Sequence, residues 1–421
     1  MLLYFLYVLL SPVLWGLLPL IALFHPKARH HLLNQKKSIK NALSIYNENR
    51  KKVVLVHAAS KGEYEQIIPL LRLIDRDKYF LLLTFSSPTL YEEALKNELT
   101  DAACYHPLDF PWAARSFFVK MDFEYYIITR NDLWPHHIIS AKKMNILTVL
   151  VNANFYREGH YSPGLAGYFF SYLLKYFDQI TTSSNRLKDN LSNITTPEKI
   201  SVTGDSRLDR VLERKKDNSG GQLSESFKES HTIILGSVIP SDYPILLKGL
   251  KKAFPEGDRT MREKNIKLIV VPHETDHSTV SQLNSILKKN NFFPDFYSEG
   301  MNRPECISLI IDTVGILPEL YAYSDLAYIG AGFGAGVHSV IEPAAYYNII
   351  SHGPNYQIVD FAVELQHANL SYHIESGDEF FRFLTLLDNK DELRSRKNEM
   401  ASFVNTQEGA AENICKVLFN D

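Results

Sequence analysis

The chain has 421 residues, of which 45% are hydrophobic and 22% charged, so it is long enough for two domains with substantial cores and is not a disordered chain. Its formal net charge of −3 gives no general attraction to nucleic acid. The three cysteines, Cys104, Cys306 and Cys415, lie far apart and form no CxxC pair, which argues against a disulfide framework and a zinc site and favours a reducing compartment.

The first predicted element is an uncharged segment from Leu2 to Phe24. As a helix it would be roughly 35 Å long at ~1.5 Å per residue, enough to cross the hydrocarbon core of a bilayer. Its two prolines and its glycine also allow a monotopic or re-entrant insertion. A cleaved signal peptide is the competing interpretation, but neither a basic start nor a small-residue cleavage site is evident. We therefore predict an uncleaved membrane anchor over residues 1–24.

The segment 25–51 that follows is basic. Together with Lys52 its cations are Lys27, Arg29, Lys36, Lys37, Lys40, Arg50 and Lys51, against the single acidic residue Glu48. By the positive-inside rule the body of the protein would lie on the cytoplasmic side of the bacterial inner membrane. Such cations attract anionic head groups at about 1 kcal/mol each.

Strands and helices alternate over residues 52–211. The predicted strands cover 52–58, 79–84, 125–129, 146–151, 179–182 and 200–203. This alternation predicts a parallel sheet with helices on both faces. No GxGxxG follows the first strand, so a standard dinucleotide fingerprint is absent.

The charged, glycine-bearing stretch 212–230 is the best linker candidate, and the strand pattern restarts after it. The predicted strands of the second domain, 231–421, cover 232–235, 266–271, 307–311 and 326–329. Each ends in a polar or glycine-rich turn, and ligands of open α/β sheets bind at that carboxyl edge. We predict two α/β domains with a cleft between them.

The last of these strands leads into four glycines at alternate positions, Gly330, Gly332, Gly334 and Gly336. Such a loop can lay backbone N–H groups against an anion, and a helix starting near the following AAYYN would add its positive end. A flexible strand-to-helix turn is the alternative. The carboxylate of Glu342 is suited to holding sugar hydroxyls beside a phosphate.

Glu63 is a candidate for a general base. It lies with Ser60 and Gly62 where the first strand hands over to a helix, at the predicted carboxyl edge. Burial there would raise the pKa of its carboxyl group toward the working range of a base. The alternative is a first-turn glutamate stabilised by the helix dipole.

Two further strand ends carry charge. Arg207, in the turn 205–210, could neutralise a phosphate or carboxylate, or form a surface salt bridge. The turn 129–135 holds Arg130 and Asp132, although it can also be a helix start with Trp134 in the core.

The sequence gives little support for a metal site or for the common catalytic motifs. His273 and His277 are four residues apart, but they follow a strand and no third ligand is apparent, so we predict no metal. Neither a P-loop GK[ST] nor a GxSxG elbow is present, which argues against P-loop and esterase chemistry.

Taken together, the motifs resemble the 3-deoxy-D-manno-octulosonic acid (Kdo) transferases of lipopolysaccharide synthesis over nearly the full length. The matching segments, in the family's order, are VHAASKGEYEQ, LWP, VNAN, TGDSRLDRV, GSVIPSD, VVPHE, DTVGILPELYAYSDLAYIGAGFGAGVHSVIEPAA and HGPNYQ. The resemblance implies a GT-B fold, with two Rossmann-like domains facing across a cleft and an N-terminal hydrophobic anchor. It also implies transfer of Kdo from CMP-Kdo, a co-substrate, to a lipid A precursor at the cytoplasmic face, with neither metal nor cofactor.

The resemblance also assigns expected roles. Glu63 falls on the base of an inverting displacement, Arg207 on a basic position that stabilises transition-state charge, and Glu342 on a partner of the ribose. Arg130 joins the expected catalytic residues, and Ser60, Gly62 and Asp132 the acceptor side. The expected donor-binding residues are Pro272, His273, Val314, Gly315, Ile316, Ser339, Val340, Ile341 and Glu342.

The chain departs from the family pattern at two places. Many members have acidic residues where Arg130 and Asp132 stand, and many have an arginine where His273 stands. Two alternative functions remain. The protein could be a GT-B transferase that uses another nucleotide sugar, or a catalytically inactive membrane-bound relative.

Overall fold

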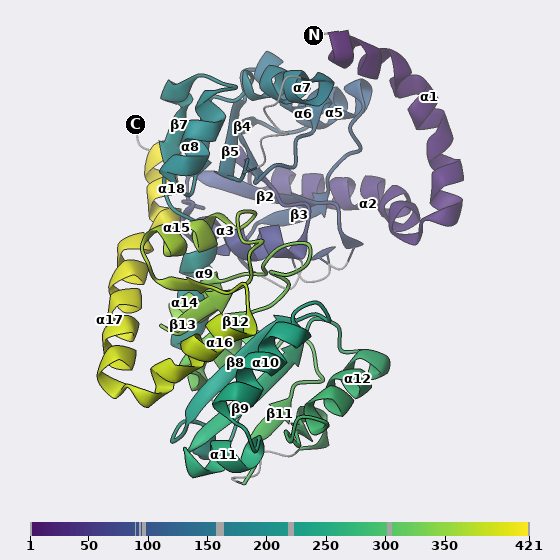
Figure 1. Ribbon diagram of the computed structural model, residues 1–421. Helices are drawn as coiled ribbons and strands as arrows, with labels where there is room; N and C mark the ends of the chain where they lie inside the picture. Colours follow the sequence, from purple (N-terminus) through teal and green to yellow (C-terminus); the bar gives the residue numbers. More distant parts are fainter. Residues whose placement is uncertain are drawn as a thin grey trace. The chain divides into compact units, whose positions relative to one another are not determined.

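The computed structural model describes residues 2–88, 90, 91, 94, 98–156, 164–217, 223–300 and 305–419. The chain forms two compact units, Met1–Arg210 with Gly409–Asp421 (unit 1) and Val211–Glu408 (unit 2). Each unit contains one seven-stranded sheet, whose strand pairs are all parallel (Figure 1). The predicted α/β class with two parallel sheets is therefore confirmed.

The sheet of unit 1 has the strand order β3-β2-β1-β4-β5-β6-β7. The strands are β1 (Lys52–His57), β2 (Tyr79–Phe85), β3 (Ala102–Tyr105), β4 (Phe123–Thr129), β5 (Leu147–Ala153), β6 (Gln179–Thr182) and β7 (Ile200–Val202). Successive residues of β1 enter two different cores, Val53 and Leu55 one, Val54 and Val56 the other. Both faces are thus buried, which explains why these strands are continuous apolar runs.

Helices cover both faces of this sheet. The helices that lie wholly or partly in unit 1 are α1 (Leu2–Phe24), α2 (Pro26–Glu48), α3 (Lys61–Leu73), α5 (Pro111–Phe118), α6 (Pro135–Lys143), α7 (Leu165–Leu174), α8 (Asn185–Ser192), α9 (Ser206–Asp217) and α18 (Ala410–Phe419), with a 3-10 turn η2 (Pro197–Lys199). The core on one face takes side chains of α2, α5, α6 and α8, and the core on the other takes those of α3 and α18.

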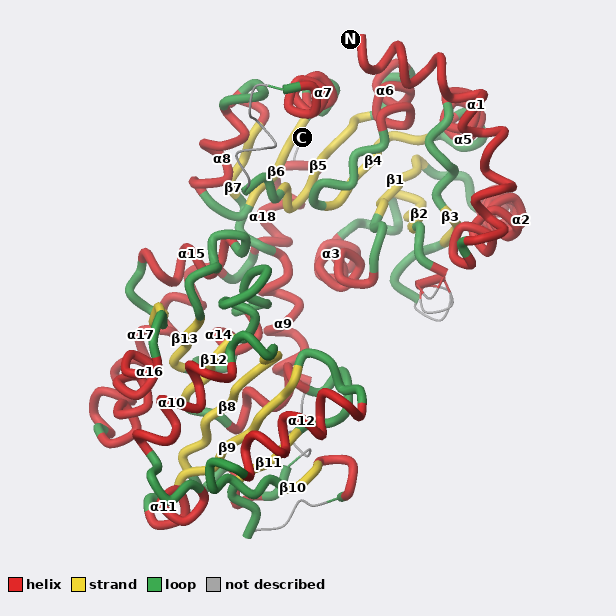
Figure 2. The backbone as a smooth tube through the Cα atoms, turned by 45° about the vertical axis from the view of Figure 1, so that its right-hand side comes forward, coloured by secondary structure: helices red, strands yellow, loops and turns green. Residues whose placement is uncertain are grey.

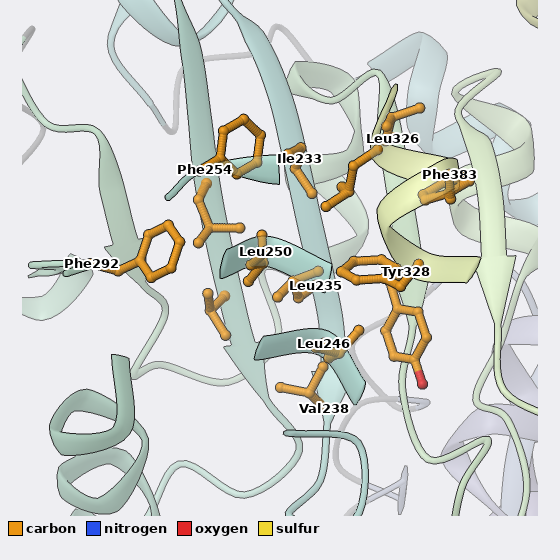
Figure 3. Close-up of a cluster of buried hydrophobic side chains, with 14 of the residues drawn as sticks. Ile233, Leu235, Val238, Leu246, Leu250, Phe254, Phe292, Leu326, Tyr328 and Phe383 are labelled. Atoms are coloured by element: carbon orange, nitrogen blue, oxygen red, sulfur yellow. The ribbon is translucent and has the colours of Figure 1, made fainter. Parts of the chain in front are cut away.

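The sheet of unit 2 has the order β10-β11-β9-β8-β12-β13-β14. Its strands are β8 (His231–Val238), β9 (Ile266–Pro272), β10 (Asp295–Phe296), β11 (Ser308–Ile310), β12 (Leu326–Ile329), β13 (Ile349–His352) and β14 (Ser371–His373). In Figure 3, Leu246 and Leu250 of α10 pack with Ile233 and Leu235 of β8 and Tyr328 of β12. This core fixes the positions of β8, β9 and β12, whose carboxyl ends carry the residues described below.

The helices of unit 2 are mostly short. They are α10 (Tyr243–Ala253), α11 (Asp258–Glu263), α12 (His277–Lys288), α13 (Leu317–Leu320), α14 (Ile341–Ala345), α15 (Asp360–His367), α16 (Gly377–Leu384) and α17 (Lys390–Gln407), with 3-10 turns η3 (Glu225–Phe227), η4 (Tyr297–Glu299), η5 (Tyr321–Tyr323) and η6 (Thr385–Asp388). The helix expected at AAYYN begins earlier, at Ile341, and ends at Ala345, before the left-handed residue Tyr347 (φ 62°).

Two predicted boundaries are wrong. The second domain does not reach residue 421, because α18 contacts α3 and β6 of unit 1 (Figure 2). The Asp209 carboxylate accepts hydrogen bonds from the N–H groups of Gly409 (2.8 Å) and Ala411 (2.7 Å) and so holds the start of α18. The predicted linker is also too long, since α9 continues helical to Asp217; residues 218–222 of that linker lie outside the described residues.

Candidate functional site

The turn after β1 fixes Glu63 at the carboxyl edge of the unit 1 sheet. Ser60, the N-cap of α3, accepts the N–H of Glu63 on its Oγ (3.3 Å), and Glu63 Oε2 accepts the N–H of Ala59 (2.8 Å). This reciprocal arrangement is a variant of the capping box. Burial raises the pKa of the Glu63 carboxyl group, against the lowering effect of the Ala59 N–H. Glu63 is therefore a first-turn glutamate, but one whose burial outweighs the stabilisation it receives from the helix start.

Asp132 lies beside this carboxylate. Its Oδ2 accepts the indole N–H of Trp134 (2.7 Å) and is hydrogen-bonded to Nε2 of the fully buried His57 (2.9 Å). Burial alone would raise the pKa of Asp132, but these two partners outweigh it and lower that pKa. Asp132 is therefore ionised, and its charge contributes to the raised pKa of Glu63.

Arg130 supplies positive charge to the same place. It follows β4 in a left-handed conformation (φ 63°), which costs a non-glycine residue about 1–2 kcal/mol, and its N–H donates to the Val151 carbonyl (2.8 Å). Its charge lowers the pKa of Glu63, opposing Asp132. Because β1 and β4 are paired neighbours, the structure brings together Glu63, Asp132 and Arg130.

Arg207 belongs to the first turn of α9, after β7. Its N–H donates to Asp205 Oδ1 (2.9 Å), which also accepts from Gln66 Nε2 of α3 (2.8 Å). Arg207 is thus tied to the helix that carries Glu63. The turn 129–135 does lead into a helix, as its alternative interpretation expected, since α6 begins at Pro135, but Trp134 is only half-buried rather than in the core.

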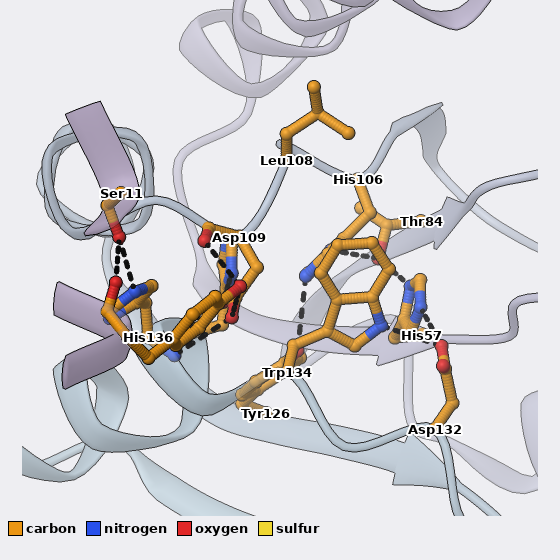
Figure 4. A network of polar contacts seen from close by, with 12 residues as sticks. Ser11, His57, Thr84, His106, Leu108, Asp109, Tyr126, Asp132, Trp134 and His136 are labelled. Carbon is orange, nitrogen blue, oxygen red and sulfur yellow. Dashed lines mark hydrogen bonds and ion pairs between the residues drawn. The ribbon is translucent and has the colours of Figure 1, made fainter. Parts of the chain in front are cut away.

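A chain of buried histidines behind Asp132 was not anticipated from the sequence (Figure 4). Thr84 Oγ1 lies 3.1 Å from both His57 Nδ1 and His106 Nδ1, and His106 Nε2 lies 3.2 Å from the hydroxyl of Tyr126. Burial lowers the pKa of His106 far below its ordinary value, so this ring is neutral. The register pairing of His57 with Thr84 at the ends of β1 and β2 creates this contact, which no local pattern reveals.

In unit 2, a fully buried carboxylate organises the loops at the ends of β8 and β12. Asp242 Oδ2 accepts the N–H groups of Ile239 and Ala331, each at 2.9 Å, and Oδ1 accepts the hydroxyl of Tyr328 (3.1 Å). In the sequence, Asp242 stands out only as the last residue of the segment GSVIPSD. Because it joins the turn after β8 to the glycine loop after β12, it holds the shape of the predicted donor region.

Most N–H groups of the glycine loop already donate hydrogen bonds within the protein. Those of Gly334, Gly336 and His338 donate to carbonyls of the loop itself. Those of Gly330, Ala331 and Val337 donate to Gly236, Asp242 and Asn355 outside it. These groups are not available to a bound anion, so the predicted backbone cradle is wrong for them. The glycines serve close packing instead: a Cβ on Gly332 would lie 2.6 Å from the backbone N of Gly353.

We expect Gly332→Ala to lower the free energy of unfolding by about 2 kcal/mol, because backbone must move to admit the methyl group. The matched control is Gly334→Ala, whose Cβ would meet the flexible end of Ile239 at 2.6 Å, a cheaper displacement. Denaturant unfolding of the two variants measures the difference. Equal losses for both would contradict the assigned packing role.

The strand end at His273 carries a pair of stacked imidazoles. The rings of His273 and His338 lie 4.4 Å apart at 15°, and His273 Nδ1 is hydrogen-bonded to Ser237 Oγ (3.0 Å). Ser237 is left-handed (φ 56°) where the pairing of β8 with β9 shifts register. Burial is the main cause that lowers the pKa of His338, and the neighbouring His273 lowers it further. Among the described residues, His338 Nε2 has no hydrogen-bond partner.

The other predicted donor residues differ in what they expose. Val314 is 78% exposed beside the left-handed Gly315 (φ 91°), and a Cβ on that glycine would meet open space. Their neighbour Ile316 is half-buried. The loop 314–316 therefore presents a freely accessible backbone.

The segment before and within α14 is mostly buried. The side chains of Val340 and Ile341, like that of Pro272 at the end of β9, face the interior, so they position the backbone rather than offer side-chain contacts. Ser339 Oγ accepts the Ile341 N–H (3.4 Å). Glu342 is half-buried near Tyr321. Burial and the charge of Glu342 both raise the pKa of the Tyr321 hydroxyl. Within the described residues, no group of three or more His, Cys, Asp or Glu side chains is placed to hold a metal.

Comparison with known proteins identifies relatives. Residues 34–210 match the family described as 3-deoxy-D-manno-octulosonic-acid transferase (kdotransferase). A 3-deoxy-D-manno-octulosonic acid transferase of Aquifex aeolicus is 27% identical over 82% of this chain and 89% of its own length. One of Rickettsia bellii is 24% identical over 90% of each chain.

The fold has solved counterparts. The UDP-GlcNAc 2-epimerase of Neisseria meningitidis superposes with a TM-score of 0.61 at 12% identity, covering 88% of this chain and all of the epimerase. This likeness concerns the fold alone, which is of the GT-B kind with two Rossmann-like units. Residues 34–210 thus match the Kdo transferase family, and the chain is a homologue of the Kdo transferases and a glycosyltransferase.

Proposed function

We propose that the protein transfers Kdo from CMP-Kdo to a lipid A precursor with inversion, using Glu63 as the general base. The main support for this proposal is the position and the raised pKa of Glu63. It is a carboxylate of raised pKa, fixed at a sheet edge inside the segment that matches the Kdo transferase family, with an ionised Asp132 beside it. A base must lose its proton easily near neutral pH yet remain basic enough to accept one, and a raised carboxyl pKa favours this.

The proposed reaction is a single displacement. Glu63 takes the proton of an acceptor hydroxyl, whose oxygen forms a bond to the anomeric carbon of Kdo. The bond from that carbon to the phosphate oxygen of CMP breaks, and CMP leaves with the electron pair. Arg207 and Arg130 supply positive charge for the anionic groups of the transition state. Ser60, Gly62 and Asp132 shape the acceptor side.

Unit 2 supports a role in holding CMP-Kdo. His273 and the unpartnered Nε2 of His338 are suited to donating hydrogen bonds to phosphate, and Glu342 to accepting those of ribose hydroxyls. The backbone of 314–316 is accessible to the base or sugar. The proposal needs neither a metal nor an organic cofactor, since protein groups supply the proton acceptor and the positive charge.

The N-terminal helix supports a membrane location. α1 contains a window from Leu3 to Phe24 with a mean hydropathy of 2.1, of which 11% is buried. With the basic segment after it, we propose that α1 anchors the enzyme at the cytoplasmic face of the bacterial inner membrane, where a lipid acceptor is found.

The pH profile of kcat/KM tests the electrostatics around Glu63. Activity should rise with pH as Glu63 loses its proton, at a higher pH than for an ordinary glutamate, since its pKa is raised. Asp132→Asn should move this acid limb to lower pH, because a charge that raises the Glu63 pKa is removed. Arg130→Gln should move it to higher pH. Shifts in the same direction would contradict the assignment.

The decisive experiment is to incubate the purified full-length protein with CMP-Kdo and a lipid A precursor and to weigh the products. A mass increase of one or more Kdo residues, with release of CMP, supports the proposal. Product from a UDP-sugar but not from CMP-Kdo would make it a transferase of another donor. Binding of CMP-Kdo without product under any condition would make it an inactive relative.

A further inference from the structure

Helix α1 is docked on the globular part of unit 1 by polar contacts. Ser11 Oγ lies 3.2 Å from His136 Nε2 (Figure 4). The Tyr7 hydroxyl donates to Asp109 Oδ2 (3.1 Å), and the rings of Tyr7 and His136 stack at 4.5 Å. Ser11, Asp109 and His136 are all buried. Tyr7 and Ser11, two of the few polar side chains of this apolar helix, thus both lie on the face that contacts unit 1.

These contacts determine how α1 can meet a bilayer. A helix that crosses the bilayer has its two ends on opposite sides of it. Tyr7 and Ser11 lie in the first half of α1 and reach the same unit as the α2 that follows it, so α1 lies along unit 1. Its outer face remains open, with Phe5, Leu9 and Val13 each at least 60% exposed. That face is suited to entering one leaflet only.

The second half of α1 does not pack tightly on the protein. Between α1, α2 and the segment 108–113 lies a cavity of about 650 Å³. Apolar side chains from all three elements line it, among them Trp15, Leu33 and Trp112. Two cations of α2, Arg29 and Lys36, also line it. Its volume lies within the roughly 300–1,000 Å³ of pockets that enclose small ligands.

We propose that this cavity holds one acyl chain of an anionic phospholipid from the bilayer, with the lipid phosphate on Arg29 and Lys36. The apolar walls match a hydrocarbon chain, and the two cations match a negatively charged head group. The source is the bilayer because one wall is the second half of α1, whose exposed apolar face is the one proposed above to enter the membrane. The bound lipid completes the packing of α1 onto unit 1.

The test uses the full-length protein on vesicles of equal parts phosphatidylcholine and phosphatidylglycerol. A phosphatidylglycerol with a photoactivatable group at the end of one acyl chain is cross-linked, and the labelled residues are mapped by mass spectrometry. We expect labels on the cavity walls, including Phe110 before α5, which is buried and which a lipid lying only on the outer face of α1 would not reach. Labels confined to that outer face would overturn the proposal.

Filling the cavity should exclude the chain. Ala22→Phe on α1 and Ala113→Phe on α5 each add a ring to a lining residue, and each should lower labelling of the walls about tenfold. The matched control is Val13→Phe on the outer face, which should leave it unchanged. Unfolding midpoints verify that the variants remain folded. Wall labelling that persists in both filled variants would contradict the proposal.

The cations and the lipid source are tested in the same assay. Arg29→Gln with Lys36→Gln should lower wall labelling per bound protein about 25-fold, since each cation near a lipid surface contributes about a fivefold factor. Lys27→Gln with Lys37→Gln, which removes the same charge outside the lining, should weaken vesicle binding but not that labelling. Displacement of the photolipid by an equimolar lipid A precursor would assign the cavity to the acceptor instead. Labelling requires no glycosyl transfer, so this result is independent of the proposed reaction.

Discussion

Glu63→Gln is expected to lower the rate of Kdo transfer by about 1,000-fold, within the range of roughly 10²–10⁴ for loss of a general base. The amide keeps an oxygen that can accept the Ala59 N–H, so the start of α3 should survive. What is lost is the ability to take the acceptor proton. Steady-state rates with saturating CMP-Kdo and lipid acceptor measure the change.

Two controls separate catalysis from structure in this variant. Glu48→Gln makes the same chemical change at an exposed position at the end of α2 and should leave the rate unaltered. Calorimetry should give the same affinity for CMP-Kdo in Glu63→Gln as in the parent protein. Transfer at the parental rate by a correctly folded Glu63→Gln protein would remove Glu63 from the mechanism.

Asp242→Ala should cost about 4 kcal/mol of unfolding free energy and greatly weaken donor binding. Two backbone N–H groups, those of Ile239 and Ala331, and the Tyr328 hydroxyl lose their acceptor, and each unsatisfied buried group costs about 1–3 kcal/mol. Because Ala331 belongs to the glycine loop, the segment leading to Glu342 would loosen. We expect the Kd for CMP-Kdo to rise by at least about tenfold.

Denaturant unfolding and calorimetry measure these two effects. Tyr328→Phe is the matched control, since it removes one of the three partners while leaving the loop N–H groups bonded to Asp242. It should cost only about 1 kcal/mol. If Asp242→Ala bound the donor as tightly as Tyr328→Phe does, the carboxylate would not be shaping the donor region.

The sequence determined the architecture because the governing patterns are local. A strand buried on both faces must be apolar at every position, so the strands at 52–57 and 326–329 are evident from their own residues. The same reasoning placed Glu63, since the first residues after a parallel strand always lie at its carboxyl edge. Four short strands, β3, β10, β13 and β14, were not predicted.

Only the tertiary structure decided which polar groups meet. Asp242 holds a loop 89 residues away, and Tyr7 reaches Asp109 across 102 residues, so neither partner can be inferred from neighbours in sequence. The glycine loop illustrates the difference: its spacing predicted an anion cradle, whereas long-range packing against Gly353 explains Gly332. Likewise, an apolar segment shows that α1 can enter a membrane, but its contacts with Asp109 and His136 determine that it lies along unit 1. The residues of a segment determine how much apolar surface it can bury. Which side chains it contacts depends on how distant segments of the chain fold together.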